Sequence, residues 1–202
     1  GEGVGSLSKA GLIHVVFGGS GGWSNTQNIY QGNDSWPGSA EAGDEFGAAL
    51  AAGDFDNDGF DDLVVGVPGE SIGSRNNAGL VMVTYGSSNG LENPENIYQN
   101  TPGVKGGSEP GDLFGSSLAT GDINGDGYPD AIIADGGASL EGAVAGLVNI
   151  YLGGEEGITP LPAQSLTHSI TSGLFGQSLT YADLTGDGIS DLVVGAPGQS
   201  LA

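Results

Sequence analysis

Short apolar runs rich in Val, Ile and Leu alternate along the whole chain with stretches rich in Gly, Asn, Asp and Ser. Residues 63–66, 131–134 and 192–195 are typical runs, each too short for a helix and bounded by turn-forming residues. No segment carries a helical apolar stripe of adequate length. The pattern therefore predicts an all-β chain of short antiparallel strands.

The runs recur with a fixed period, which is the sequence signature of a repeat architecture. Residues 11–17, 79–85 and 146–152 align with one another at a spacing of about 68 residues. Each repeat holds four runs, named here strands A to D: A begins at a Phe-Gly pair, B follows an Asp-rich loop, C begins at Gly-Leu, and D lies near Asn-Ile-Tyr in the first two repeats. Four strands in a repeat of this length predict a β-propeller built from four-stranded blades. The Phe-Gly pairs are Phe46-Gly47, Phe114-Gly115 and Phe175-Gly176.

The two ends of the sequence fall at the same point of the repeat. Residues 1–11 match residues 69–79, and residues 197–200 match residues 68–71. The chain therefore opens with strands C and D of one blade and closes with strands A and B of another. We expect one propeller domain over residues 1–202 with two full blades plus two half-blades. The repeats run over approximately 11–78, 79–145 and 146–202.

This arrangement raises the question of how the propeller closes. A closed propeller needs about four to eight blades, and an open arc leaves strand edges unpaired. One solution is a homodimer in which the A–B half of one chain pairs with the C–D half of the other, giving six blades with two-fold symmetry. The other is that the chain is a fragment of a longer protein that supplies further blades. The sequence leaves both solutions open.

An Asp-rich loop lies between strands A and B of every repeat, at residues 54–62, 122–130 and 183–191. Oxygen-bearing side chains stand at loop positions 1, 3, 5 and 9, and Gly stands at position 6 in all three loops. Calcium takes six to eight oxygen ligands, and Gly at position 6 permits the sharp turn that brings them together, with a backbone carbonyl from position 7. The sequence thus predicts about three Ca²⁺ ions per chain. The predicted ligands are Asp54, Asp56, Asp58, Phe60 and Asp62; Asp122, Asn124, Asp126, Tyr128 and Asp130; and Asp183, Thr185, Asp187, Ile189 and Asp191.

The loops differ from an EF-hand, which needs Glu at position 12 and flanking helices. Position 12 is Val65, Ile133 or Val194, each within an apolar run, so the loop belongs to a β-hairpin and is closed by Asp at position 9. Magnesium fits less well, because it keeps its waters and prefers fewer protein ligands. The first loop should bind calcium most tightly, because Asn124 and Thr185 replace a carboxylate at position 3 of the other two.

The composition narrows the range of partners and reactions. The chain has 3 Lys and Arg against 25 Asp and Glu, a net charge of −22, and therefore repels nucleic acid and anionic membrane surfaces. No apolar run is long enough for membrane insertion. The absence of Cys excludes disulfides, thiolate metal sites and a Cys nucleophile. With two His and no Gly-x-Ser-x-Gly motif, we predict a non-enzymatic protein without catalytic residues.

The succession of Phe-Gly, Asp loop and Gly-x-Pro, the last at residues 66–68 and 195–197, resembles the FG-GAP repeat of integrin α-subunit propellers and their microbial relatives. The resemblance covers essentially the whole chain. It implies calcium in the A–B loops and a role in adhesion or recognition. Residues 134–136, Ala-Asp-Gly, depart from the Gly-x-Pro pattern, so a looser B–C corner is expected there. Integrin propellers have seven blades, whereas two chains of this kind make six.

Three functional hypotheses follow. The first is a calcium-stabilised, non-catalytic propeller module at an extracellular or cell-surface location, which binds an unidentified protein or glycan. The alternative is an accessory propeller domain of a secreted polysaccharide hydrolase or lyase. A purely structural repeat array is the third.

Five aromatic, cationic and histidine side chains are candidate contacts. In a blade the A–B and C–D loops share one face, and the B–C and D–A loops share the other. The second face carries Trp36 and Arg75, residue types that anchor interfaces, although packing of Trp36 over the blade corner is the simpler interpretation. Trp23, on the face with the Asp loops, is equally ambiguous. His14 is interpreted as a packed or edge residue, and His168 has no partner of catalytic type nearby in sequence.

Overall fold

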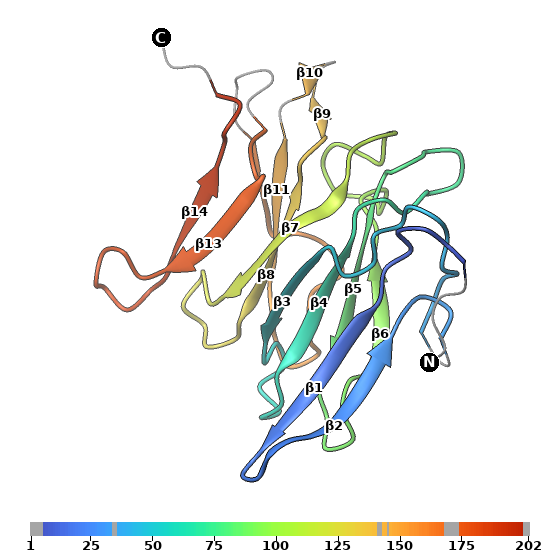
Figure 1. Cartoon of the computed structure of the whole chain (residues 1–202). Helices are drawn as coiled ribbons and strands as arrows, with labels where there is room; N and C mark the ends of the chain where they lie inside the picture. The colour runs from blue at the N-terminus through green and yellow to red at the C-terminus, as the bar shows by residue number, and fades with distance from the viewer. Residues whose placement is uncertain (1–5, 34–35, 141–142, 145, 168–173, 200–202) are drawn as a thin grey trace.

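A computed structural model describes residues 6–33, 36–140, 143–144, 146–167 and 174–199. Over these residues the chain forms strands and turns and no helix, so there is no helix that could span a membrane. The described strands assemble into five sheets, four of which are arranged side by side as a fan (Figure 1). The predicted all-β architecture is confirmed.

Two of the sheets are complete blades of four antiparallel strands. The first complete blade has the strand order β3-β4-β5-β6, and the second has the order β7-β8-β11-β12. These orders correspond to strands A, B, C and D, as the repeat predicts. The bounds are β3 (Ala49–Gly53), β4 (Asp62–Val67), β5 (Leu80–Tyr85), β6 (Glu92–Ile97), β7 (Phe114–Gly121), β8 (Asp130–Asp135), β11 (Leu147–Tyr151) and β12 (Gln164–Thr167).

Two further sheets are the half-blades. The N-terminal half-blade pairs β1 (Ile13–Gly19) with β2 (Gly22–Ile29), and the C-terminal one pairs β13 (Ser178–Ala182) with β14 (Asp191–Gly195). They lie at opposite ends of the fan (Figure 1). The predicted two full blades plus two half-blades are therefore what the chain forms.

Two features differ from the sequence prediction. Strands β2 and β6 begin well before the Asn-Ile-Tyr motifs, because the outer strand of a blade is largely exposed and its polar first half gives no apolar signal. The B–C connection of the second complete blade also holds a small hairpin of β9 (Ser139–Leu140) and β10 (Ala143–Val144). In the first complete blade a single antiparallel bridge between Ile72 and Arg75 lies at the matching place.

Apolar side chains from both faces of each blade pack against the neighbouring blades. Phe55 and Val64 of the first complete blade are buried together with Phe114 and Ile133 of the second. On its other face, the first complete blade contributes Val65 to a cluster with residues of the β1–β2 half-blade. Because central strands are covered on both sides, they read as continuous apolar runs rather than as alternating patterns.

Each strand C begins at a glycine that touches the backbone of the next blade. The Phe114 N–H donates to the Ala78 carbonyl at 3.1 Å, next to Gly79. A Cβ atom added to Gly79 would lie 2.3 Å from the Phe114 nitrogen, and one added to Gly11 would lie 2.2 Å from the Phe46 oxygen. This close approach explains the pairing of Gly-Leu with Phe-Gly in every repeat.

We expect Gly79→Ala to destabilise the fold by several kcal/mol. It combines the cost of a left-handed residue, about 1–2 kcal/mol, with a backbone clash. Gly111→Ala is the matched control, since Gly111 has a φ of 85° against 87° for Gly79 but no atom within 4 Å of its added Cβ. Urea unfolding of both variants provides the measurement. Equal losses of stability would show that the close contact between blades contributes nothing.

Candidate metal loops

The three Asp loops connect strand A to strand B and lie at the same end of their blades as the C–D connections. In the first complete blade, the N–H of Gly86, which follows β5, donates to Asp62 at 2.8 Å. In the second, the N–H of Gly153 donates to Asp130 at 3.1 Å. The predicted arrangement, with A–B and C–D loops on one face, is therefore present in both complete blades.

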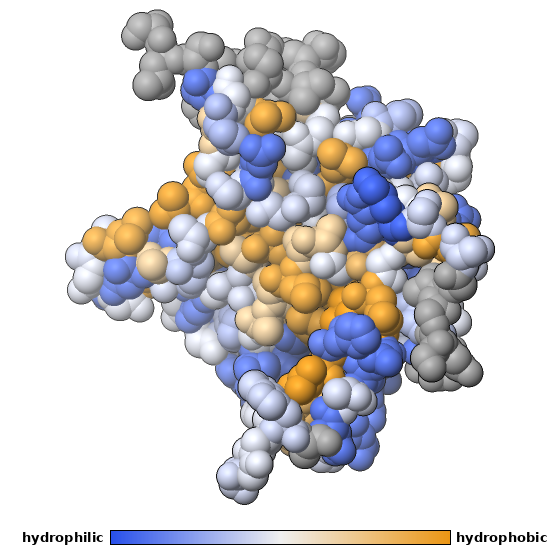
Figure 2. All heavy atoms as spheres, in the orientation of Figure 1, coloured by the Kyte–Doolittle hydropathy of each residue, from blue (hydrophilic) through white to orange (hydrophobic). Residues whose placement is uncertain are grey.

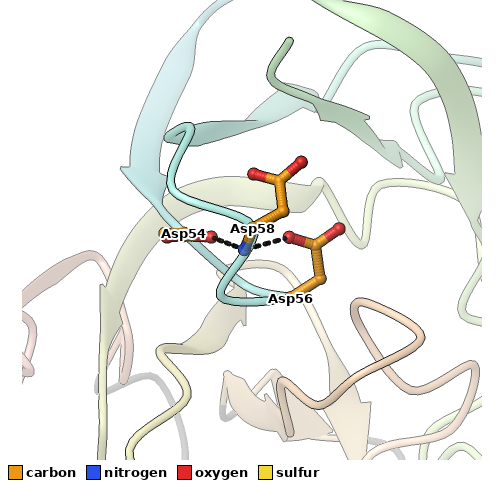
Figure 3. A group of neighbouring side chains, drawn as sticks. All are labelled: Asp54, Asp56 and Asp58. Atoms are coloured by element: carbon orange, nitrogen blue, oxygen red, sulfur yellow. Dashed lines mark hydrogen bonds between the residues drawn. The ribbon is translucent and has the colours of Figure 1, made fainter.

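The first loop gathers three carboxylates. Asp54, Asp56 and Asp58 each offer an oxygen, and these oxygens all lie within 4.8 Å of one another (Figure 3). The backbone N–H of Asp58 donates to Asp54 at 3.0 Å and to Asp56 at 3.1 Å, which folds the loop around these side chains. Two oxygens that share a calcium ion at 2.3–2.6 Å lie at most about 5 Å apart. The spacing in the first loop thus fits a hard cation.

The second and third loops repeat the turn with fewer carboxylates. The N–H at position 7 donates to the carboxylate at position 5 in all three loops, from Phe60, Tyr128 and Ile189, at 2.8 Å, 3.0 Å and 2.9 Å. In the second loop the Asn124 amide donates to Asp126 at 2.8 Å. Among the described residues, only the first loop brings three acidic groups within reach of one ion.

Asp183 illustrates how the backbone favours charge at position 1. Its carboxylate accepts the N–H groups of Gly188 at 2.9 Å and Gly186 at 2.6 Å. These bonds from Gly188 and Gly186 lower the pKa of Asp183 below its usual value. The third loop therefore holds an ionised, exposed carboxylate with Thr185 beside it, since the Thr185 hydroxyl lies 3.5 Å from Asp183.

The Asp at position 9 has a role that the sequence did not reveal. Asp62 is 1% exposed, and its two oxygens accept the N–H of Phe55 at 2.8 Å and the N–H of Gly86 at 2.8 Å. Asp130 makes the same pair of bonds with Ile123 and Gly153. Each carboxylate thereby ties its own loop to the end of strand C. Burial is the main cause that raises the pKa of Asp62, to about 6, and that raises the pKa of Asp130.

A buried acidic residue, Asp135, lies on the face opposite the Asp loops, where the sequence predicted no site. Asp135, in the corner that departs from the Gly-x-Pro pattern, is fully buried and hydrogen-bonded to the Gln99 amide. Burial, followed by the nearby charge of Asp112, raises the pKa of Asp135 to about 9. The corner is closely packed, because a Cβ added to Gly137 would lie 1.9 Å from the Gly111 oxygen. Asp135 stands at the position where the first complete blade has the buried Val67. This exchange of an apolar residue for a carboxylic acid was the sequence signal of the buried acidic residue.

The aromatic, cationic and histidine candidates differ in their exposure to solvent. Trp36 is 7% exposed and packs in the core, so it is not a surface anchor. Trp23 is 79% exposed and lies in the β1–β2 hairpin. His14 lies exposed on β1, with its Nδ1 atom 2.6 Å from the Asn28 amide oxygen. Arg75 is exposed in a B–C loop, and His168 lies outside the described residues.

We expect Asp62→Ala and Asp130→Ala to destabilise the chain even without divalent cations. Each truncation leaves two backbone N–H groups without their acceptor, at a cost on the order of 1–3 kcal/mol per group. Asp58→Ala is the control, since it removes an exposed carboxylate from the same loop and relieves repulsion. Thermal unfolding in EDTA compares the three. A loss for Asp58→Ala as large as that for Asp62→Ala would contradict the structural role of position 9.

Comparisons with known proteins agree with the repeat. The family model described as FG-GAP repeat matches residues 46–83, and the model described as FG-GAP-like repeat matches residues 122–194. The chain is 35% identical over 154 residues to the phosphatidylinositol-glycan-specific phospholipase D of Bos taurus, covering 75% of the chain and 18% of the relative. It is 37% identical over 164 residues to integrin alpha-4 of Xenopus laevis, covering 79% and 15%. For integrin alpha-PS5 of Drosophila melanogaster the identity is 36% over 166 residues, covering 78% and 15%. The chain therefore spans less than a fifth of the length of these relatives.

Proposed function

Because the chain belongs to the FG-GAP repeat family of integrin α-like β-propellers, we propose that it is a calcium-binding, non-catalytic propeller module for adhesion or recognition outside the cell. The observation that carries the proposal is the set of three Asp loops in register, of which the first holds three carboxylate oxygens within 4.8 Å. The integrin alpha relatives support the binding role.

A calcium ion bound at these loops would stabilise the fold. Without a cation, close carboxylates repel one another by about 4 kcal/mol at 4 Å and an effective dielectric constant of 20. In the first loop Asp54, Asp56 and Asp58 would hold the ion, with the carbonyl of Phe60 beside them. Asp62 already accepts two backbone N–H groups, so any bond from it to the ion would use its remaining lone pairs. A bound ion would therefore stabilise the blade end that the position 9 carboxylates hold together.

Calcium titration of the EDTA-treated chain by calorimetry tests this part of the proposal. We expect Asp56→Asn, which copies position 3 of the second loop, to weaken the tightest site about tenfold, because it removes one charged ligand. Asn124→Asp should strengthen the second site by a similar factor. The matched control is Asp61→Asn, which removes an exposed charge from the same loop outside the ligand set.

Two results would contradict the calcium assignment. The first is the absence of saturable calcium binding by the wild-type chain. The second is an equal weakening by Asp61→Asn and Asp56→Asn, since only the total charge of the loop would then matter.

The binding role is tested separately with arrays of extracellular-matrix proteins and polysaccharides, probed by the labelled chain in calcium and in EDTA. We expect capture that requires calcium, without release of any product from the captured material. Trp23 supplies a reporter, because it is 79% exposed whereas Trp36 is buried. A ligand that contacts the β1–β2 hairpin would change the fluorescence of the wild type and not that of Trp23→Phe. Turnover of an arrayed polysaccharide by the chain would overturn the non-catalytic assignment.

The similarity to phosphatidylinositol-glycan-specific phospholipase D favours a second candidate function. In that case the chain is an accessory propeller domain of a secreted hydrolase or lyase, and it binds the substrate or positions the catalytic part. Binding of a polysaccharide or a glycosylated phosphatidylinositol by the chain, with no hydrolysis, supports this candidate. Binding only to proteins supports the first.

A further inference from the structure

A groove separates the outer parts of the two complete blades. It has a volume of about 540 Å³ and lies between β6 of the first complete blade and residues 154–160 of the second, which connect β11 to β12. Apolar side chains also gather along the β13–β14 hairpin and over β3 and β4 in the middle of the face that Figure 2 shows, but those areas belong to a half-blade or adjoin one. The groove has a complete blade on each side, and the two blades pack directly on each other. A further blade therefore cannot be what covers it.

Three glutamates and an apolar wall line this groove. Val83 stands opposite Glu95 across β5 and β6, and Val83 packs with Ile158 in the core between the two blades. The connection from β11 to β12 adds two more acidic residues, Glu155 and Glu156. All three glutamates are exposed. The groove thus combines an apolar wall with three negative charges.

The chain has a second groove at the equivalent place one blade earlier, and that groove carries no such charges. It has a volume of about 440 Å³ and lies between β2 and the connection from β5 to β6. The repeat matches three pairs of lining residues, which are Gln27 with Glu95, Ser88 with Glu155, and Asn89 with Glu156. We call the earlier groove the neutral groove and the later one the acidic groove. The chain thus holds two versions of one groove that differ in charge.

Gln27 closes the neutral groove with two hydrogen bonds to the facing connection. Its Nε2 atom donates to the Leu91 carbonyl at 3.1 Å, and its Oε1 atom accepts the Leu91 N–H at 3.2 Å. Ile158 corresponds to Leu91, and its N–H donates instead to the Tyr85 hydroxyl at 3.2 Å. The ionised Glu95 side chain has no N–H group to offer the Ile158 carbonyl. The acidic groove therefore lacks the donor that a side-chain amide supplies in the neutral groove.

The described residues do not neutralise the charges of the acidic groove. They form one ion pair, between Lys9 and Glu45, and neither of these residues lines the groove. Burial raises the pKa of Tyr85, and the negative charge of Glu95 raises it further, so the groove wall lies in the field of that carboxylate. The glutamates are not grouped for a metal ion either, because among the described residues only the first Asp loop brings three acidic oxygens within 4.8 Å of one another. The matching ligand is an organic cation with N–H groups.

We propose that the acidic groove binds a lysine or arginine side chain from a basic segment of a partner protein. The aliphatic stem of such a side chain packs on Val83 and Ile158. Its cationic head donates to Glu95 and to the Ile158 carbonyl, as the side-chain amide does in the neutral groove. Glu155 and Glu156 attract the rest of the basic segment. The inference rests on the proposed recognition function, to which it adds a site and a class of partner.

A basic partner matches this charge better than a second copy of the chain does. The chain has three cationic residues, Lys9, Arg75 and Lys105, and a net charge of −22. Two copies therefore repel each other, whereas a basic protein is attracted to the chain from a distance. Because exposed charges are screened by ions, we expect salt to weaken the binding.

Titration of the chain with short labelled peptides, followed by fluorescence anisotropy in calcium, tests the proposal. One probe carries lysine and another carries arginine, and each has a neutral counterpart with norleucine or citrulline at the same positions. All probes are blocked at both ends, so that the side chains alone carry charge. We expect saturable binding of a basic probe at about 0.05 M salt, weaker binding at about 0.5 M salt, and no binding of the neutral counterparts. The two basic probes also show which cationic side chain the groove prefers.

Variants of the chain locate the binding in the acidic groove. Glu95→Gln copies the neutral groove, and we expect it to weaken binding of the basic probe about tenfold, because it removes a hydrogen bond between charged groups. Glu155→Ser with Glu156→Asn, which copies the first complete blade, should also weaken binding. Glu92→Gln is the matched control, since Glu92 is an exposed glutamate of β6 that does not line the groove. Circular dichroism of all variants should stay unchanged, because the exchanged side chains are exposed.

Three results would overturn the proposal. The first is the absence of saturable binding of both basic probes by the wild-type chain, and the second is equal binding of a neutral counterpart. The third is an equal loss of affinity in Glu95→Gln and Glu92→Gln, since only the total charge of the chain would then matter. Calorimetry measures calcium binding and the arrays measure capture independently of these probes. A chain that binds calcium and captures an arrayed ligand, but not the basic probes, would contradict the groove assignment and leave the proposed function standing.

Discussion

A blade of this chain has two apolar faces, and only neighbouring blades cover them. In the first complete blade Val64 packs toward the second complete blade, whereas Val65 packs toward the β1–β2 half-blade. The continuous apolar runs follow from this constraint, and so do the glycines at which strand C touches the next blade. The constraint also explains why exposed apolar residues such as Val193 occur on the half-blades, where one neighbour is missing. Repetition of the sequence is thus a physical requirement of the fold.

The Asp loops combine two tasks that need different chemistry. The position 9 carboxylate is buried and accepts backbone N–H groups, so it joins the A–B loop to the end of strand C. The carboxylates at positions 1, 3 and 5 lie nearer the surface and are gathered around the turn. The buried carboxylate of Asp62 holds the loop in place through two backbone N–H groups. The loop conformation in turn brings the negatively charged carboxylates at positions 1, 3 and 5 close together. The geometry that strengthens the blade end therefore also places three carboxylates where a bound cation would lower their mutual repulsion.

The sequence predicted the blades because period, turn residues and apolar runs all reflect backbone pairing and burial. It could not predict the bonds of Asp62, because a ligand at position 9 and a buried backbone acceptor require the same residue. Trp36 was ambiguous for a similar reason, since a large aromatic side chain suits both a core and an interface. The buried Asp135 replaces an apolar residue of the repeat, and the repeat period carries no information about such an exception. The early start of β2 and β6 was missed because exposed outer strands are polar.

Acidic side chains on the two faces of the propeller differ in their protonation state. The chain has 25 acidic residues and 3 Lys and Arg, and the described residues hold one ion pair, between Lys9 and Glu45. On the face with the Asp loops, hydrogen bonds from backbone N–H groups lower the pKa of Asp183, so this carboxylate stays ionised. On the opposite face, burial raises the pKa of Asp135 to about 9, so this group is protonated at neutral pH. The folded state binds that proton more tightly than the unfolded chain, so the resulting stability is full below about pH 4 and is lost as the pH rises to about 9. Raising the pH to about 9 therefore weakens the second complete blade at the face opposite its Asp loop, where Asp135 is buried.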